Sequence, residues 1–262
     1  MEMEWFFMKL YVTDKWKIIK YTTIMFTICF VFTISNNIPL DVIATIAGSK
    51  LLPIYNIQTE EKVLSLTFDS AWGAEDMSDI LSTLKKEGVE ATFFVLGEWA
   101  EKYPDVIKQM VADGHDVANH SDTHPHTNEL NYDEVKNEII NANNKIKNIT
   151  GVENKLFRAP YGEYNNTVIS AATELGYYTI QWNVDSLDWK NPGQEAIINR
   201  VTSKVSPGSI ILLHNGTQDT AKALPLLISR LKADGYAFKP VSELIYKENY
   251  TIDHTGKQIK NK

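Results

Sequence analysis

Short apolar segments alternate with amphipathic segments from residue 63 to residue 239, and this alternation restricts the folds available to the chain. In the amphipathic segments apolar residues recur three and four positions apart, as at Met77, Ile80, Leu81 and Leu84, which is the spacing of one buried helix face. Strands that alternate with helices form a parallel sheet. The pattern predicts strands over residues 63–68, 91–96, 116–119, 155–158, 177–183, 209–213 and 236–239.

Glycines end the predicted helices at the positions where a left-handed cap is expected. They are Gly88, Gly114, Gly151, Gly176 and Gly235. About seven strand-then-helix units favour a closed or nearly closed α/β barrel over an open sheet.

Composition restricts the class of protein. With 262 residues and 44% hydrophobic side chains, the chain can bury one substantial core. A formal charge of −7 argues against a nucleic-acid partner, because phosphate binding needs a basic face. Cys29 is the one cysteine of the sequence, so no intramolecular disulfide and no thiolate metal cluster can form.

The N-terminal part has the pattern of an export or anchoring signal. Lys15, Lys17 and Lys20 precede an uncharged run at 21–34, whose 14 residues suit a signal anchor better than a full span of about 20. The lysines would stay inside and the domain outside the membrane. Cleavage near Ala47 would instead secrete the domain, but that position is far from the apolar run. A buried core helix is the other reading, disfavoured because nothing before the run could cover its other side.

This pattern divides the chain into three parts. Residues 1–48 would comprise a cytoplasmic basic flank, the apolar anchor helix and a connector, and residues 49–250 would form the main folded domain. Residues 251–262 are expected to be a basic, disordered tail.

Ionisable side chains follow most of the predicted strands. In βα barrels the active site lies at the C-terminal ends of the strands, so these residues should meet in space. They are Asp69, His120, His124, Arg158, Asp185, Asp188 and His214. A helix cap or a solvated loop acid explains any one of them, but not the whole set.

The segment HSDTHPH contains a candidate metal-binding pair. His120 and His124 are four residues apart, which in a helix or tight turn places both imidazoles on one side, as two ligands of one divalent ion require. A structural role for the pair is equally compatible with the spacing. His115 and His126 are expected to be bystanders. A third ligand, such as a carboxylate, would be needed for a catalytic zinc or similar ion.

Five motifs in order resemble those of the polysaccharide deacetylases, the NodB-homology carbohydrate esterases of family 4. They are TFDS at 67–70, HSDTH at 120–124, RAPYG at 158–162, DSLDW at 185–189 and LLH at 212–214. The resemblance extends from Val63 to about Ile245. It implies a distorted (β/α)7 barrel and hydrolysis of N-acetyl groups on amino sugars. The form FDSAWG, with the N-terminal apolar run, looks most like the sporulation-type, membrane-anchored subgroup.

The resemblance also implies roles for individual residues. His120 and His124 would bind the metal, zinc or cobalt, and Asp69 would be the catalytic base. Arg158 would hold Asp69 ionised, while His214 would be the general acid, tuned by Asp188. Substrate and oxyanion contacts would come from the residues Tyr161, Asp185, Trp189 and Leu212.

Ser70 departs from the family pattern, which has a metal-binding aspartate at this position. Ser70 or a water could complete a weaker site, Asp69 could become a ligand, Asp122 or another acid could substitute, or no metal binds. The readings are therefore a working deacetylase, an impaired member that binds glycan, or a hydrolase of another acylated glycan.

An enzyme of another class is also compatible with part of the pattern. Asp69 and Asp185 could serve as the two carboxylates of a glycoside hydrolase, but His120 and His124 would then have no role. The substrate polymer, whether peptidoglycan or a chitin-like glycan, does not follow from the motifs.

Overall fold

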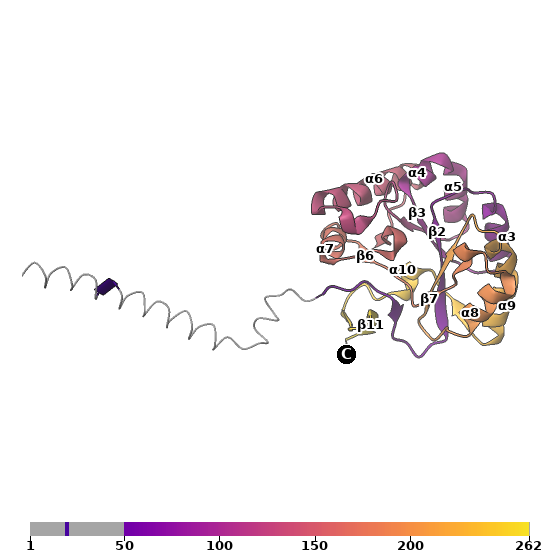
Figure 1. The fold of residues 1–262 in the computed structure, drawn as a ribbon. Coiled ribbons are helices and arrows are strands. Elements are labelled where there is room, and N and C mark those ends of the chain that lie inside the picture. Colours follow the sequence, from indigo (N-terminus) through magenta and orange to yellow (C-terminus); the bar gives the residue numbers. More distant parts are fainter. Residues whose placement is uncertain (1–18, 21–49, 262) are drawn as a thin grey trace, which may run out of the picture. The chain divides into compact units, whose positions relative to one another are not determined.

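The computed structural model describes residues 19–20 and 50–261 (Figure 1). Its contacts divide the chain into two units, Met1–Lys50 and Leu51–Lys262. The predicted anchor at 21–34 lies outside the described residues. Among the residues that are described, we find no helix with the length and apolarity needed to cross a membrane. The second unit contains all five motifs.

A curled sheet of parallel strands forms the centre of this unit, in the order β6-β5-β4-β3-β2-β8-β7, with β9 paired to β2. The α/β class and the parallel sheet predicted from the sequence are confirmed. The strands are β2 (Val63–Ser70), β3 (Thr92–Val95), β4 (Asp116–Asn119), β5 (Leu156–Phe157), β6 (Tyr178–Thr179), β7 (Val184–Asp185), β8 (Ile210–His214) and β9 (Ala237–Phe238).

Helices lie around the outside of the sheet, with α4 to α7 on one side and α3, α8 and α9 on the other (Figure 1). Gly88 and Gly151 end α3 and α6 in the left-handed conformation, as predicted from the sequence. The helices are α3 (Met77–Glu87), α4 (Gly97–Lys102), α5 (Pro104–Ala112), α6 (Tyr132–Thr150), α7 (Asn166–Glu174), α8 (Gln194–Thr202), α9 (Thr220–Ala233) and α10 (Val241–Leu244), with short 3-10 turns η1 (Thr127–Glu129), η2 (Pro160–Gly162) and η3 (Asp188–Lys190).

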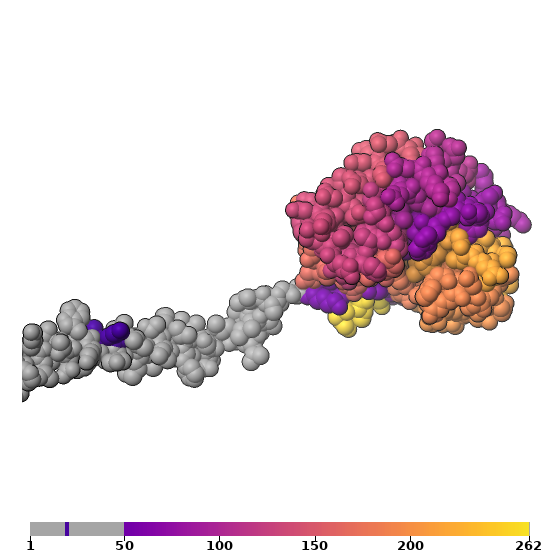
Figure 2. Space-filling view, turned by 45° about the horizontal axis from the view of Figure 1, so that its top comes forward, coloured from indigo at the N-terminus to yellow at the C-terminus, as the bar shows by residue number. Residues whose placement is uncertain are grey.

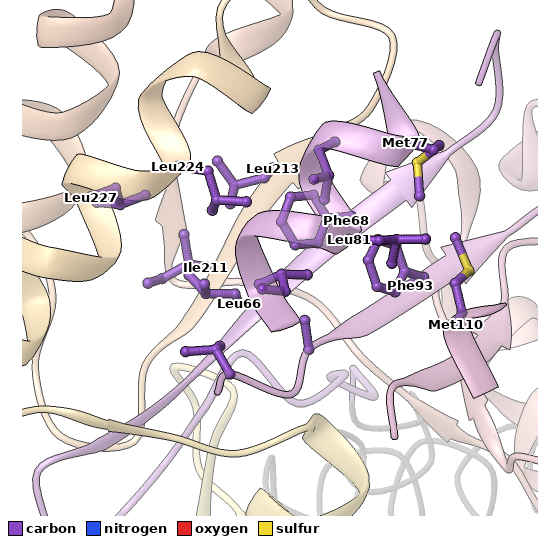
Figure 3. Close-up of a cluster of buried hydrophobic side chains, with 14 of the residues drawn as sticks. Leu66, Phe68, Met77, Leu81, Phe93, Met110, Ile211, Leu213, Leu224 and Leu227 are labelled. Carbon is purple, nitrogen blue, oxygen red and sulfur yellow. The ribbon is translucent and has the colours of Figure 1, made fainter. Parts of the chain in front are cut away.

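The apolar faces of β2, β3 and β8 pack against the helices. Figure 3 shows Leu66 and Phe68 of β2 with the side chains of β8 and α9 on one side and Phe93 of β3, followed by Met110 of α5, on the other. The rings of Phe68 and Phe93 are stacked with centroids 5.0 Å apart. Because successive strand residues point to opposite faces, this packing leaves Ser65, Thr67 and Asp69 on the inner face of the barrel.

The predicted strand at 177–183 is wrong in its extent, because the chain leaves the sheet after two residues of β6. Within residues 50–261, β6 and β7 are not paired with each other. The segment around Ile54 fills the gap: its N–H donates to the Thr179 carbonyl at 2.9 Å and its carbonyl accepts from the Gln181 N–H at 2.7 Å. The Ile57 N–H then donates to the Gly208 carbonyl at 3.0 Å. The barrel is therefore closed partly by a segment that precedes β2.

The expected disordered tail is also corrected by the structure. Strand β11 (Lys257–Lys260) pairs with β10 (Tyr250–Ile252) and with β1 (Asn56–Ile57) in a separate three-stranded sheet. Figure 2 shows the yellow C-terminal surface against the indigo residues that follow Lys50. Gln258 is fully buried and exchanges two hydrogen bonds with the backbone of Tyr246, so the C-terminal segment is fixed to the domain.

We predict that Gly208→Ala destabilises the protein more than Gly151→Ala. Both glycines have a positive φ, which costs another residue about 1–2 kcal/mol. A Cβ on Gly208 would also overlap the backbone carbonyl of Ile57, whereas a Cβ on Gly151 meets nothing within 4 Å. Chemical denaturation should show a loss of about 3 kcal/mol or more for Gly208→Ala. Equal losses for the two variants would show that the segment at 54–57 does not constrain β8.

Candidate active site

The C-terminal strand ends surround one cavity of about 590 Å³. The predicted site residues that line it are Asp69, His120, His124, Tyr161, Asp185, Trp189, Leu212 and His214. The remaining three, Ser70, Arg158 and Asp188, are fully buried behind its wall. The structure therefore brings together side chains that are far apart in the sequence. Asp69 and His214, 145 positions apart, are register partners on the adjacent strands β2 and β8.

Asp69 is held by a buried ion pair. Arg158 Nη1 donates to Asp69 Oδ1 at 2.6 Å and to Thr67 Oγ1 at 2.9 Å, and Nη2 donates to the Gln181 carbonyl at 3.1 Å. Burial alone would raise the pKa of Asp69, but the positive charge of Arg158 and the hydrogen bond that it donates outweigh burial and lower it. Asp69 is therefore ionised at neutral pH, as a general base must be.

His120 and His124 are neutral imidazoles beside this carboxylate. His120 Nδ1 donates to the Arg158 carbonyl at 2.8 Å, which leaves Nε2 as the acceptor, 3.7 Å from Asp69 Oδ2. Burial lowers the pKa of His120, and burial with the neighbouring His120 lowers the pKa of His124 to about 4. The two rings are edge to face with centroids 5.3 Å apart. Both have the protonation state of metal ligands at neutral pH.

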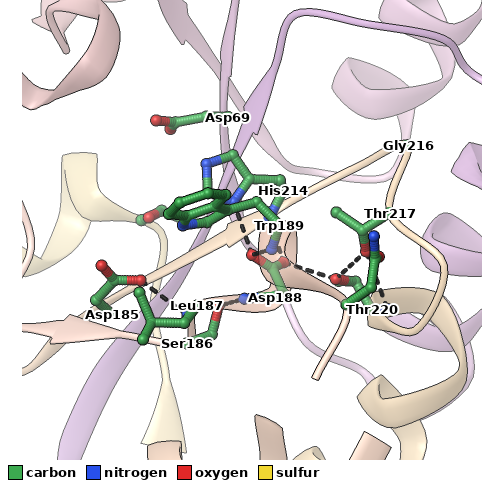
Figure 4. Close-up of polar contacts among 12 residues, drawn as sticks. Asp69, Asp185, Ser186, Leu187, Asp188, Trp189, His214, Gly216, Thr217 and Thr220 are labelled. Atoms are coloured by element: carbon green, nitrogen blue, oxygen red, sulfur yellow. Dashed lines mark hydrogen bonds and ion pairs between the residues drawn. The ribbon is translucent and has the colours of Figure 1, made fainter. Parts of the chain in front are cut away.

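His214 forms the other charged pair of the cavity (Figure 4). Its Nδ1 is 2.7 Å from Asp188 Oδ1, and its backbone N–H donates to Asp188 Oδ2 at 2.7 Å. Asp188 also accepts from Thr220 Oγ1 at 2.6 Å. Burial opposes protonation of His214, but the hydrogen bond and charge of Asp188 outweigh burial and raise its pKa. The pair thus favours a protonated imidazole that faces Asp69.

Tyr161 has a backbone conformation that is unusual for a residue with a side chain. Its φ is 58°, in the left-handed region, which stores strain of the kind that gathers at functional sites. Its ring lies between two histidines, 4.5 Å from His124 and stacked on His126 at 4.3 Å between centroids. His126 in turn contacts Glu163, with Nδ1 and Oε1 2.8 Å apart. His126 therefore supports Tyr161, while His115 packs on Phe93 in the core.

The donors present do not fit a zinc site with three protein ligands. Ser70 offers a neutral hydroxyl, whose buried Oγ has no hydrogen-bond partner in the structure. Asp122 is paired with Lys145 Nζ at 3.0 Å and does not line the cavity. Asp69 is already bonded to Arg158. Across residues 19–20 and 50–261 no group of three acidic, histidine or cysteine side chains is placed to hold an ion. The chain supplies two imidazoles, and we assign no chemical step to a metal.

Other residues of the site were not predicted from the sequence. Thr67 and Thr220 hold Arg158 and Asp188 through their hydroxyls. Thr67 is two positions before Asp69 on one strand, so strand alternation could have indicated it. Thr220 begins α9 and has no such signal. Trp72 lines the cavity and contacts the edge of His124, with centroids 5.2 Å apart.

Comparison with known proteins identifies the family. The model of the polysaccharide deacetylase family matches residues 56–180. The peptidoglycan-N-acetylmuramic acid deacetylase PdaA of Bacillus subtilis is 34% identical over 198 residues, which cover 74% of this chain and 75% of PdaA. The chain belongs to the polysaccharide deacetylase family. This membership confirms the resemblance that the five motifs indicated.

Two further relatives are described without an enzymatic activity. The uncharacterized B. subtilis protein YlxY is 35% identical over 74% of this chain, and the match spans 60% of YlxY. A solved Bacillus anthracis structure described as a family 4 carbohydrate esterase pseudoenzyme is 36% identical, with a TM-score of 0.72 over 74% of this chain and 69% of that one. The family thus includes members with and without activity at this degree of similarity.

We predict that Asp188→Asn lowers the pKa of His214, because the variant removes the charge that favours the imidazolium. Because the pKa of His214 is higher in the folded than in the unfolded protein, protonation of His214 stabilises the fold. This stabilisation is complete below the pKa of an unfolded histidine, about 6.5, and is lost as the pH rises through the folded pKa. The variant should therefore lose stability mainly at acidic pH. NMR titration of the imidazole measures the pKa. Asp185→Asn is the control. Among the carboxylates that raise the pKa of His214, Asp185 contributes least, so its loss should lower that pKa less than the loss of Asp188 does. A His214 pKa that is unchanged in Asp188→Asn would refute the pairing.

Proposed function

We propose that this protein hydrolyses N-acetyl groups on amino-sugar glycans of the cell wall, releasing acetate and a free amine. One observation carries the proposal: an ionised carboxylate and a protonatable imidazole, each held by a buried counter-charge, face the same cavity. A site that only binds glycan has no use for a base and an acid whose pKa values are shifted apart.

The residues divide the reaction between them. Asp69 takes a proton from a water molecule while the oxygen of that water attacks the carbonyl carbon of the acetyl group. His214 gives a proton to the nitrogen as the C–N bond breaks, so the amine leaves neutral. The Tyr161 N–H is assigned to the developing oxyanion and Leu212 to the acetyl methyl. The opposite pKa shifts of Asp69 and His214 widen the pH range in which base and acid are both in the working form.

We also infer where the reaction takes place. The lysine-flanked apolar run at 21–34 supports a membrane anchor with the domain outside the cytoplasm. The FDSAWG form of the first motif, together with that run, supports a role in sporulation. Peptidoglycan is the substrate class that the activity named for PdaA favours.

A glycan-binding protein without activity is the second candidate. Ser70, the missing third ligand and the pseudoenzyme of similar fold favour it. In this reading the cavity would retain sugar contacts, while the two charged pairs would have only a structural role.

Acetate release from peptidoglycan and from N-acetylglucosamine oligomers distinguishes the two candidates. We predict release without chain shortening, reduced by at least about 10²-fold in Asp69→Asn and in His214→Ala. Leu226→Ala, an exposed residue of α9, is the control. Circular dichroism checks that each variant is folded. Binding without acetate would support the second candidate, and shortened oligomers would indicate a glycoside hydrolase.

We predict that Ser70→Asp increases zinc affinity by more than about tenfold. Residues that only hydrogen-bond to metal ligands already change metal affinity by about tenfold or more, and a direct carboxylate ligand should change it further. Ser70→Asn is the matched control, with a similar volume and no charge. Competition titration of the full-length protein against a zinc-binding dye measures the affinity without reference to activity. If the aspartate and asparagine variants bind zinc equally, Ser70 does not explain the missing ligand.

A further inference from the structure

Three large aromatic side chains are exposed around the cavity. In residues 50–261 the exposed large aromatics are Trp72, Tyr161 and Trp189, with 63%, 55% and 56% of their surface accessible, and all three line the cavity. Exposed apolar surface that gathers at one place marks a binding site, whereas single exposed residues are ordinary. Tyr161 and Trp189 belong to motifs already assigned to substrate, but Trp72 does not.

The backbone beneath Trp72 is fixed from two sides. The Trp72 and Gly73 carbonyls both accept from Trp99 Nε1, at 3.2 and 2.7 Å, and both accept from Asn215 Nδ2, at 3.2 and 3.0 Å. The next residue of the facing loop, Gly216, donates its N–H to Asp76 at 2.9 Å. The loop after β2 is thus tied to the loop after β8. These hydrogen bonds fix the backbone that carries the indole at the rim of the cavity, where 63% of the Trp72 surface is accessible.

The two tryptophans belong to different parts of the cavity wall. Trp72 follows β2 and its ring meets the edge of His124. Trp189 is in η3, next to the Asp188 that holds His214, and both Trp189 and His214 line the cavity (Figure 4 shows this segment). A ligand that touches both indoles therefore spans from the histidine pair to the general acid, passing Asp69.

Sugars with equatorial substituents fit these surfaces. Their ring faces carry C–H groups that pack on flat aromatic rings, while their edges carry hydroxyls and acetamido groups. One sugar ring that places its acetamido group at Asp69 can cover one indole, and the second indole then contacts a neighbouring ring of the same chain.

We propose that Trp72 is a specificity-determining residue that stacks on a second sugar ring, so that the cavity binds an N-acetylated oligosaccharide in preference to a monosaccharide. This inference rests on the proposed function for the identity of the ligand, and it assigns the chain length of that ligand. Trp72 selects the substrate by packing and has no part in proton transfer.

Isothermal titration of the full-length protein with N-acetylglucosamine and with its oligomers tests the inference. Trp72→Ala should weaken oligomer binding about tenfold and leave monosaccharide binding unchanged, since one aromatic contact contributes on this scale. Trp72→Phe should retain most of the oligomer affinity, because it keeps a flat ring. Leu226→Ala should match the wild type.

Three outcomes would overturn the inference: no oligomer binding by the wild type, unchanged oligomer binding in Trp72→Ala, or equal losses for monomer and oligomer. Acetate is measured in the same samples. Trp72-dependent oligomer binding without acetate release would refute the proposed hydrolysis while supporting the role of Trp72.

Discussion

The buried ion pair between Arg158 and Asp69 is the interaction on which the rest of the site depends. Arg158 is fully buried, with its guanidinium 4.0 Å from the ring centroid of Phe94 and 5.4 Å from that of Trp182. A charge in such surroundings is tolerated only with a counter-charge and hydrogen bonds, and Asp69, Thr67 and the Gln181 carbonyl provide them. The pair joins the ends of β5 and β2 across the interior of the barrel, so the same contact that satisfies the buried guanidinium also positions Asp69, the proposed base.

The second charged pair complements the first because of strand register. Asp69 and His214 are partners on adjacent parallel strands, so their side chains emerge on the same face. Arg158 lowers the pKa of one and Asp188 raises the pKa of the other. With His120 and His124 kept neutral by burial, one cavity contains a carboxylate, two uncharged imidazoles and a third imidazole, that of His214, whose protonation is favoured. Burial disfavours the charged form of all four side chains. At Asp69 and His214 the neighbouring charge outweighs burial and sets the direction of the pKa shift.

The sequence was most informative where a residue's position follows from the repeated strand and helix. Asp69, Arg158 and His214 could be assigned to one site because parallel strands end at one edge of the sheet. The gap beside β6 and the segment at Ile54 that fills it could not be predicted, since two isolated bridges leave no periodic pattern. The C-terminal hairpin was missed for a related reason. In Lys257–Lys260 the buried residue is the polar Gln258, so the strand lacks an apolar buried face that alternation could reveal. Hydrogen bonds to the backbone of Tyr246 satisfy the Gln258 side chain in its buried position. The sequence did not indicate a binding role for Trp72, because the exposure of its indole depends on how the loop after β2 folds.

Ser70 separates two functions that the family motif combines. A second aspartate would add charge and a metal ligand beside the base, and the serine removes both while leaving Asp69 bonded to Arg158. His214 is likewise oriented by Asp188, and His120 by the Arg158 carbonyl. None of these three side chains needs an ion to take its position. With serine at position 70, the side chains of Asp69, His214 and His120 are thus still oriented by protein groups, as preorganisation of a site requires.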